Sequence, residues 1–395
     1  MNVNARNKES MRSILKKTLV TLIVLIVFFM GRLIPLYGIS IDENYSLFAM
    51  QSRSLLSLGM TPGMTAMILW RIFTLGKDQE YQLITENNIY RVKMLLMLVI
   101  ATIQSLGLLT QLQLMDKSLY EYADFIILNT IILITGAFFS QWLSNVIYLD
   151  GLGGNSVLVA ATILGNYIPE LKIDFLSSLG HSIEISIIFI IVLIVLLFII
   201  NFIFFSEYRM YYRQILSIEE VKSESYIPIK IIPAMGMPFM YALSLFTFVK
   251  AFLLFLFRFN KFSFLKKVGE NLSLSNFTGV ILLSLLIFII SIGFAFFNID
   301  TANLSKRMEE NGDYFNKINP GRDSYKFINS KVLFFGIFGA LFNVIITVIP
   351  LILGNLIGVH QITVFGILGG TILIILSIFT QIFQQITVLY RKYKI

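Results

Sequence analysis

The sequence predicts an all-α, polytopic membrane protein with ten transmembrane helices. Of its 395 residues, 56% are hydrophobic and only 14% are charged, and the mean hydropathy is +0.80. These values lie far outside the composition of soluble domains. Apolar runs such as 18–30, 185–205 and 280–297 approach or reach the roughly 20 residues that cross a bilayer. Lipid is therefore the expected solvent of much of this chain.

The predicted spans follow the apolar runs in order. The first run is expected to be retained rather than cleaved as a signal peptide, because Arg32 and Pro35 follow it in place of a small-residue cleavage site. The ten spans cover residues 16–37, 61–75, 92–114, 123–147, 156–169, 183–205, 231–252, 276–297, 331–353 and 364–389.

Basic residues set the expected orientation. On this map most of the 31 Lys and Arg residues fall on one side, so both termini and the loops 206–230 and 298–330 are predicted to be cytoplasmic. The same bias explains the net charge of +8, and the dispersal of the bases argues against nucleic-acid binding. A basic, Phe-rich segment at 250–267 falls in an outer loop. It indicates either an interfacial helix with snorkelling bases or a misplaced boundary.

The second predicted span is short and interrupted. Ser57 to Met64 breaks the apolar pattern, and Thr61 followed by Pro62 predicts a helix start with a capping hydroxyl. A helix from Pro62 to about Leu75 covers only roughly half to two-thirds of the hydrocarbon thickness. The preceding residues are too polar to span, so their backbone is expected to be buried in protein or to line a wet cavity.

A similar break occurs in the second half of the chain, where Ala234 to Met240 echoes Gly59 to Met64. Paired interruptions in corresponding positions indicate the functional centre of an internally repeated membrane protein. Two unrelated proline kinks are the alternative interpretation. Methionine occurs at both breaks, and its flexible apolar side chain suits a ring that closes around varied passengers and resists ions by dewetting.

Six short motifs, spread over nearly the whole chain, occur in the order of a known family pattern. They are Ser57 to Ala66, Gly153 to Ser156, Tyr226 to Lys230, the loop motif Thr301 to Leu304 with Gly312 to Gly321 and Tyr325, Gly369 to Thr371, and Gln384 with Gln385. In this order they resemble the SecY family, the pore subunit of the protein-conducting translocation channel.

The resemblance implies two inverted five-helix halves, 1–178 and 179–395, around an hourglass pore. It implies a plug within 41–56 and a lateral gate between the second and seventh helices. The positions that match the pore ring are Met60, Met64, Val157, Ala161, Met237 and Ile375, and those at the helix breaks and gate are Pro62, Thr65, Gly236 and Pro238.

The resemblance also implies partners and a location, the plasma membrane. A SecA-type motor ATPase is expected on the two cytoplasmic loops, beside a small SecE-like subunit or accessory Sec proteins, membrane lipid and an unfolded preprotein. The residues assigned to motor docking are Arg209, Arg213, Lys306, Arg307, Asn319, Pro320, Gly321 and Arg322.

Departures from the family pattern indicate a subtype. Asn319 stands where the family has the arginine of Arg-Pro-Gly, the plug region is short, and the paired arginines of the sixth-to-seventh loop appear only as Arg209 and Arg213. These changes resemble the accessory SecY of Gram-positive bacteria. That resemblance implies export of serine-rich, glycosylated proteins by a dedicated SecA, and a housekeeping-type SecY is the alternative.

Other function classes fit the residues less well. A secondary transporter needs ionisable groups in its spans, whereas the predicted spans hold mainly amides and hydroxyls such as Gln104, Asn129 and Asn343. The sequence shows no Ser/His, paired-Asp or metal-ligand constellation, no phosphate-binding glycine loop and no Cys. We therefore expect no enzymatic activity, no cofactor and no metal.

Overall fold

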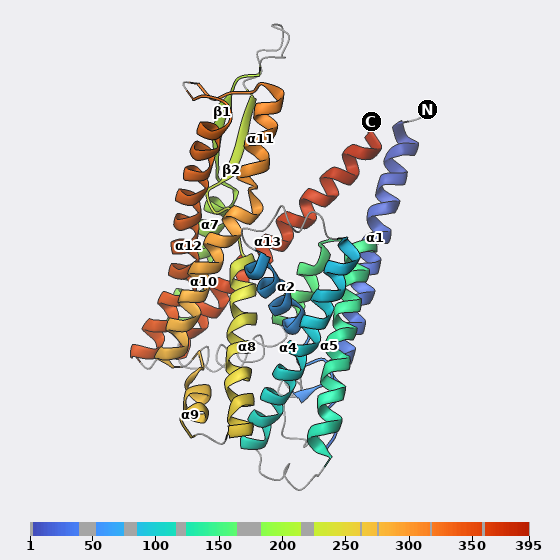
Figure 1. Cartoon of the computed structure of the whole chain (residues 1–395), viewed down its shortest axis with the longest axis vertical. Helices are drawn as coiled ribbons and strands as arrows, with labels where there is room; N and C mark the ends of the chain where they lie inside the picture. Colours follow the sequence, from blue (N-terminus) through green and yellow to red (C-terminus); the bar gives the residue numbers. More distant parts are fainter. Residues whose placement is uncertain are drawn as a thin grey trace. The chain divides into compact units, whose positions relative to one another are not determined.

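The computed structural model describes residues 3–38, 53–74, 85–115, 124–163, 183–214, 225–260, 263–274, 276–316, 318–357 and 360–394. Its elements are drawn in Figure 1. In chain order they are α1 (Val3–Gly31), α2 (Thr61–Thr74), α4 (Glu86–Met115), α5 (Phe125–Asp150), a short helix (Gly154–Ile163), α7 (Ile183–Phe205), β1 (Glu207–Tyr212), β2 (Ser225–Lys230), α8 (Met237–Asn260), α9 (Ser263–Asn271), α10 (Phe277–Asn298), α11 (Thr301–Asn311), α12 (Arg322–Ile357) and α13 (His360–Lys394).

The prediction of a helical membrane protein is confirmed. Every predicted span overlaps a helix, and seven helices in the described ranges are long and apolar enough to cross a membrane. In a bilayer the backbone must satisfy its hydrogen bonds internally, which helices do. The uniformly apolar spans 183–205 and 276–297 agree with α7 and α10 to within one residue.

The boundary of the seventh predicted span was wrong. The span 231–252 corresponds to α8, which begins at Met237 and ends at Asn260. Non-helical backbone occupies 231–236, and the helix continues through the first part of the Phe-rich segment before α9 follows. The basic residues of 250–267 therefore belong in part to the end of α8, where Arg258 Nη1 donates to Thr110 Oγ1 of α4 at 3.4 Å.

The chain divides into two compact units. Unit 1 comprises residues 1–173, 243–279 and 377–395, and unit 2 comprises 174–242 and 280–376. Helices α8 and α13 therefore contribute to both units. The division into halves 1–178 and 179–395 stays a prediction. Most of the predicted plug lies outside the described residues, which resume at Arg53.

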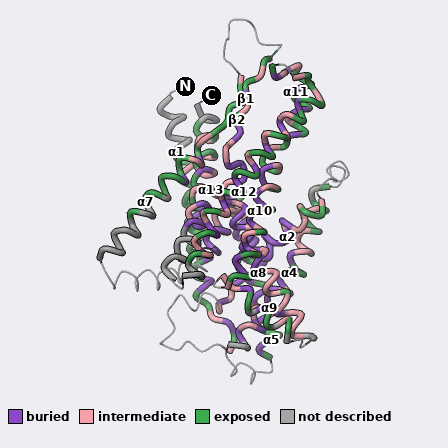
Figure 2. The backbone as a smooth tube through the Cα atoms, turned by 90° about the vertical axis from the view of Figure 1, so that its left-hand side faces the viewer, coloured by how far each residue is buried: buried purple, intermediate pink, exposed green. Residues whose placement is uncertain are grey.

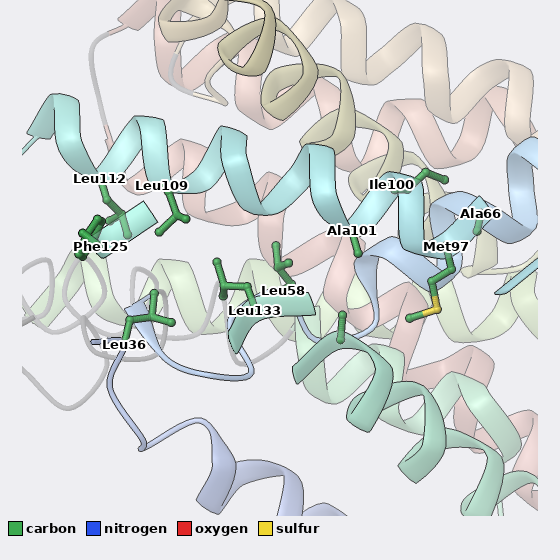
Figure 3. Packing of buried hydrophobic residues seen from close by; sticks show 11 residues of the cluster. Leu36, Leu58, Ala66, Met97, Ile100, Ala101, Leu109, Leu112, Phe125 and Leu133 are labelled. Atoms are coloured by element: carbon green, nitrogen blue, oxygen red, sulfur yellow. The ribbon is translucent and has the colours of Figure 1, made fainter. Parts of the chain in front are cut away.

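The core of unit 1 packs α2, α4 and α5 together. Figure 3 shows its buried side chains, with Leu109 and Leu112 of α4 close to Phe125 at the start of α5. Leu58, which precedes α2, lies beside Leu133 of α5 in the same cluster. The non-helical segment before α2 is thus held by apolar packing inside unit 1.

Unit 2 contains a β-hairpin that the sequence analysis did not predict. Strands β1 and β2 pair antiparallel, with Glu207 opposite Lys230 and Tyr212 opposite Ser225. Tyrosine and isoleucine favour this pleated pairing, and Met210 and Ile229 are buried against α11 and α12. The ends of the loop 206–230 are therefore ordered on a small apolar core.

Exposed apolar side chains fit a lipid environment. Figure 2 colours the described residues of α7 mostly as exposed, and among them Phe198 and Phe202 are 73% and 71% exposed. Such a surface would be unfavourable in water. It is expected of a helix that faces acyl chains.

Candidate functional site

The first helix break lies in unit 1, immediately before α2. Gly59 has a φ of +48°, a conformation that favours glycine, and a Cβ there would lie 2.5 Å from Thr162 Cγ2. The Met60 N–H donates to Thr162 Oγ1 at 3.4 Å. The break is therefore fitted closely against the short helix Gly154–Ile163, and α2 runs for only 14 residues.

The predicted cap of α2 was wrong in detail. The helix begins at Thr61, one residue before Pro62, and Met60 O accepts the Met64 N–H at 3.0 Å. The Thr61 hydroxyl donates to Leu58 O at 2.7 Å instead of accepting from the first turn. Thr61 therefore ties the helix to the turn before it.

Arg32 is a structural residue that the sequence analysis did not single out. It follows α1, is fully buried, and its Nη1 donates to Thr162 O at 3.2 Å. Thr162 thus accepts one hydrogen bond from the end of α1 and one from the first break. A buried arginine is costly unless its polar groups are satisfied, so this contact fixes α1 and the break to the short helix.

The unit 1 members of the predicted pore ring lie on these two neighbouring segments. Met60 and Met64 are fully buried at the start of α2. Val157 and Ala161 are four residues apart on the short helix and so share one of its faces, and Ala161 adjoins Thr162, the partner of Met60. Unit 1 therefore brings these four positions into one region.

Two family motifs meet at the start of the short helix. The Gly153 N–H donates to Gln385 Oε1 of α13 at 2.8 Å, and the Ser156 hydroxyl donates to Gln381. Both partners belong to the part of α13 in unit 1. These contacts fix the turn before the short helix.

The second break lies in unit 2, before α8. Met235 has a φ of +55°, the only non-glycine residue in the described part of the chain with a positive φ, which is strained for a side chain of this size. Two amide side chains, buried Asn343 and exposed Asn298, donate hydrogen bonds to the backbone carbonyls of this break. Asn343 Nδ2 donates to Met235 O at 3.2 Å, and Asn298 Nδ2 donates to Pro233 O at 2.8 Å.

Gly236, one of the predicted residues of this break, packs against α13. A Cβ on Gly236 would overlap the carbonyl of Leu373, so only glycine permits this approach. Met237 begins α8 and Pro238 is buried in its first turn. Ile375 follows Leu373 by two residues and is 50% exposed. Unit 2 therefore brings Gly236 and Met237 close to the α13 segment that carries Ile375.

The two breaks share a construction. In each, one residue with positive φ lies two positions before the helix starts, and polar side chains from elsewhere in the same unit satisfy the free backbone groups. Non-helical backbone at membrane depth is tolerated when it is satisfied in this way. That the two breaks share a role stays a prediction.

A polar contact joins α2 to α8 within unit 1. Thr65 Oγ1 lies 2.8 Å from Ser244 Oγ, and Ser244 Oγ donates to Thr61 O at 2.9 Å. Both Thr65 and Ser244 are buried. Thr65 was a predicted gate residue and Ser244 was not. The signal in the sequence for Ser244 is a polar serine within an apolar run.

The residues of the two predicted cytoplasmic loops belong to unit 2. A β-bridge joins Arg213 to Tyr314, with N–H···O distances of 2.9 and 3.0 Å, so the hairpin and the connection between α11 and α12 lie together. Gly321 O accepts the Ser305 hydroxyl at 3.0 Å, and Asn319 O accepts the Ser324 hydroxyl at 2.9 Å. The predicted docking residues of both loops therefore belong to one structured region.

Charged groups in this region differ in their burial. Arg209 Nε donates to Glu207 at 2.8 Å and lies over the Tyr226 ring, and this hydrogen bond raises the pKa of Arg209. Burial lowers the pKa of Lys230, whose amine lies 5.6 Å from the Phe204 ring centre. Burial also raises the pKa of the Asp313 carboxyl. Among the described residues no group of His, Asp and Glu is arranged to hold a metal ion.

Comparison with known proteins identifies a consistent set of relatives. The family model described as SecY matches residues 54–383. The accessory Sec system protein translocase subunit SecY2 of Streptococcus sanguinis is 31% identical over 361 residues, which cover 86% of this chain and 87% of that protein. The protein of the same name from Leuconostoc gelidum is 28% identical over 420 residues, covering 99% and 98%.

Solved structures of protein-conducting channels share the fold. One such channel superposes with a TM-score of 0.66 at 16% identity, covering 97% of this chain and 94% of the other. Sec61 in the canine ribosome–channel complex superposes with a TM-score of 0.61 at 17% identity, covering the same 97% and 94%.

Proposed function

This chain belongs to the SecY family, and on that premise we propose that it is the pore-forming subunit of a protein-conducting channel of the accessory type. It has no enzymatic role of its own in this proposal. A partner SecA-type ATPase drives export of serine-rich, glycosylated preproteins across the plasma membrane, and both termini of the chain are cytoplasmic.

The pair of broken helices carries this proposal. Each break places a methionine, Met60 or Met237, at the start of a helix whose preceding backbone is non-helical. We propose that the two breaks face one passage, and that Met60, Met64, Val157, Ala161, Met237 and Ile375 form its constriction. Soft apolar side chains can close around varied polypeptides, and a narrow apolar ring excludes ions by dewetting.

The contact between α2 and α8 is the proposed lateral gate. Thr65 and Ser244 join the two helices by hydroxyl groups. Interhelical hydrogen bonds of this kind contribute only modestly in membranes. They can therefore hold the gate closed at rest and release it when an apolar segment of a passenger leaves toward lipid.

The ordered loop cluster in unit 2 is the proposed docking surface of the motor. It offers Arg209, Arg213, Lys306, Arg307 and Arg322 on a scaffold fixed by the hairpin and α11. Asn319 stands in place of the arginine of the family's Arg-Pro-Gly motif, which favours a dedicated partner over a general one. A small SecE-like subunit or accessory Sec proteins complete the proposed assembly.

The ring assignment is tested by ion leak through the closed channel. We expect replacement of Met60, Met64 and Met237 by serine to raise the conductance of bilayers that contain the purified protein, because polar side chains keep the constriction wet. Met30→Ser, on an exposed position of α1, is the control. Unchanged conductance in the triple variant would contradict the assignment.

The accessory type is tested separately from the pore. We expect the protein to copurify with one dedicated SecA-type motor, and its deletion to abolish export of a few serine-rich glycoproteins while general secretion continues. Loss of general secretion on deletion would instead favour the housekeeping type.

A further inference from the structure

A short connector, residues 231–236, joins strand β2 to α8 in unit 2. Its first residue continues the pairing of the hairpin, because the Ile231 N–H donates to Ser206 O at 3.1 Å. Four of its six residues are buried, and Gly236 lies directly against the backbone of Leu373. The connector is therefore too short and too closely packed to absorb a displacement of the hairpin without moving the start of α8.

Met235 is the strained residue of this connector. Its φ of +55° lies in the left-handed region, which is unfavourable for a residue with a Cβ and free of that cost for glycine. The first break has Gly59 at the corresponding position, two residues before its helix starts. A methionine at position 235 therefore indicates that its side chain makes a contact that offsets the strain.

The Met235 side chain contacts the base of the hairpin. Lys230, the last residue of β2, donates from Nζ to Met235 Sδ at 4.0 Å. The same amine lies 5.6 Å from the ring centre of Phe204 in α7, and Lys230 is paired with Glu207 in the register of the hairpin. Met235 thus links the position of the hairpin to the backbone conformation that immediately precedes Met237.

Two amides hold the strained conformation from the helices behind it. Asn343 Nδ2 donates to Met235 O at 3.2 Å, and Asn298 Nδ2 donates to Pro233 O at 2.8 Å. Asn343 is fully buried on α12 and also bonds Ser291 Oγ of α10 at 3.3 Å. Strained backbone persists only where the surrounding structure over-determines it. The strain at Met235 is therefore stored for as long as these contacts are intact.

We propose that Met235 is a positioning residue, which holds Met237 at the constriction of the closed channel and releases it when the hairpin is displaced. A partner that docks on the hairpin draws Lys230 away from Met235. The side chain then no longer offsets the strain, and the backbone at Met235 relaxes to a negative φ. Because Met237 is only two residues further on, this rotation moves it relative to Leu373 and its neighbours on α13. The inference rests on the proposed function, which assigns Met237 to the ring and the hairpin to docking.

Single-channel conductance of the purified full chain in planar bilayers tests this role without a motor. Asn343→Leu leaves Met235 O without its donor, so we expect the fraction of time that channels conduct to rise about tenfold. Met235→Gly removes the strain from the closed state, so that fraction should fall about tenfold. Adding Met235→Gly to Asn343→Leu should bring it back toward the parent value. Asn276→Leu removes an amide that donates to Asn271 O before α10, and it should leave conduction unchanged.

A double-mutant cycle isolates the contact between the hairpin and Met235. Lys230→Met keeps an unbranched side chain but removes the donor, so conduction should rise about threefold in the parent protein. In the Met235→Gly background the same substitution should have no effect, because the contact is already absent. Lys326→Met, at an exposed position of α12, is the matched control and should change neither protein. An equal effect of Lys230→Met in both backgrounds would overturn the coupling.

Replacement of Met60, Met64 and Met237 by serine separates the failure of this inference from that of the proposed function. If that replacement raises conductance but Asn343→Leu and Met235→Gly do not change it, the ring stands and Met235 has no positioning role. If that replacement leaves conductance unchanged, the ring assignment falls and this role falls with it. Thermal unfolding shows whether each variant is folded. A lower unfolding temperature with unchanged conduction in Asn343→Leu would assign Asn343 to stability alone.

Discussion

Ser244→Ala is expected to shift the lateral gate toward its open state. Three close oxygen pairs join Thr61, Thr65 and Ser244, at 2.8, 2.8 and 2.9 Å, but two hydroxyls supply only two protons. One or two hydrogen bonds therefore link α2 to α8 at any moment. At about 0.6 kcal/mol for each interhelical bond, the variant loses about 0.6–1.2 kcal/mol, which shifts the gate equilibrium about three- to eightfold.

A fluorescent pair on the two helices measures this shift. The chain has no Cys, so Ile72→Cys on α2 and Phe252→Cys on α8, both exposed, accept dyes without competing thiols. We expect Ser244→Ala to increase the population with separated dyes by the factor above. Thr65→Val should give the lower end of the three- to eightfold range. Of the two hydroxyl contacts of Thr65, the one with Thr61 O lies within α2 and only the one with Ser244 crosses to α8.

Ser284→Ala is the control for this experiment. The Ser284 hydroxyl donates only to Ile281 O of its own helix, so its removal should leave the dye populations unchanged. Equal populations in the parent protein and in Ser244→Ala would refute the reasoning that these hydroxyls hold the gate. A change of the same size in Ser284→Ala would assign the effect to the loss of any serine.

Three further variants test the packing, the second break and the loops. Gly107→Ala places a Cβ 2.6 Å from Ala251 Cα and should lower the unfolding free energy by about 1–3 kcal/mol. Gly293 has open space around it, so Gly293→Ala should leave the unfolding free energy unchanged. Equal effects of the two substitutions would exclude close packing as the cause. Asn343→Leu removes the donor to Met235 O and should cost about 1–3 kcal/mol, measured by thermal unfolding in detergent, and an unchanged unfolding temperature would contradict that role. Burial raises the pKa of Asp313 above its ordinary value of 3.8, so the folded state holds this proton more tightly and stability falls as the pH rises between the two pKa values. Asp313→Asn should flatten that fall, and parallel pH profiles for the two proteins would count against a buried carboxyl.

The sequence predicted those features that depend on local composition. Helices α7 and α10 are uniformly apolar, so hydropathy places their ends closely. Pro62 and Pro238 indicated the two breaks because proline and glycine interrupt helices locally. The motifs that resemble SecY are likewise short and contiguous, and the family comparison agrees with them.

The features that the sequence missed depend on contacts between distant residues. Arg32 and Thr162 are 130 positions apart, and Thr65 and Ser244 are 179 apart, so no local pattern connects them. The hairpin was missed because its strands are separated by a polar segment and gain their stability from α11 and α12. The start of α8 was placed too early because residues 231–234 are apolar, although Met235 and Gly236 keep them out of the helix.

The central claim, that the two breaks face one passage, is tested most directly by cross-linking. Met60→Cys and Met237→Cys introduce the only thiols of the chain, and a short bis-maleimide should join them in membranes. The pair Met60→Cys and Ile289→Cys, with Ile289 exposed on α10, should stay unjoined. We expect a high yield for the first pair that falls when a preprotein is arrested in the channel. No cross-link between positions 60 and 237, or the same yield with position 289, would contradict the account.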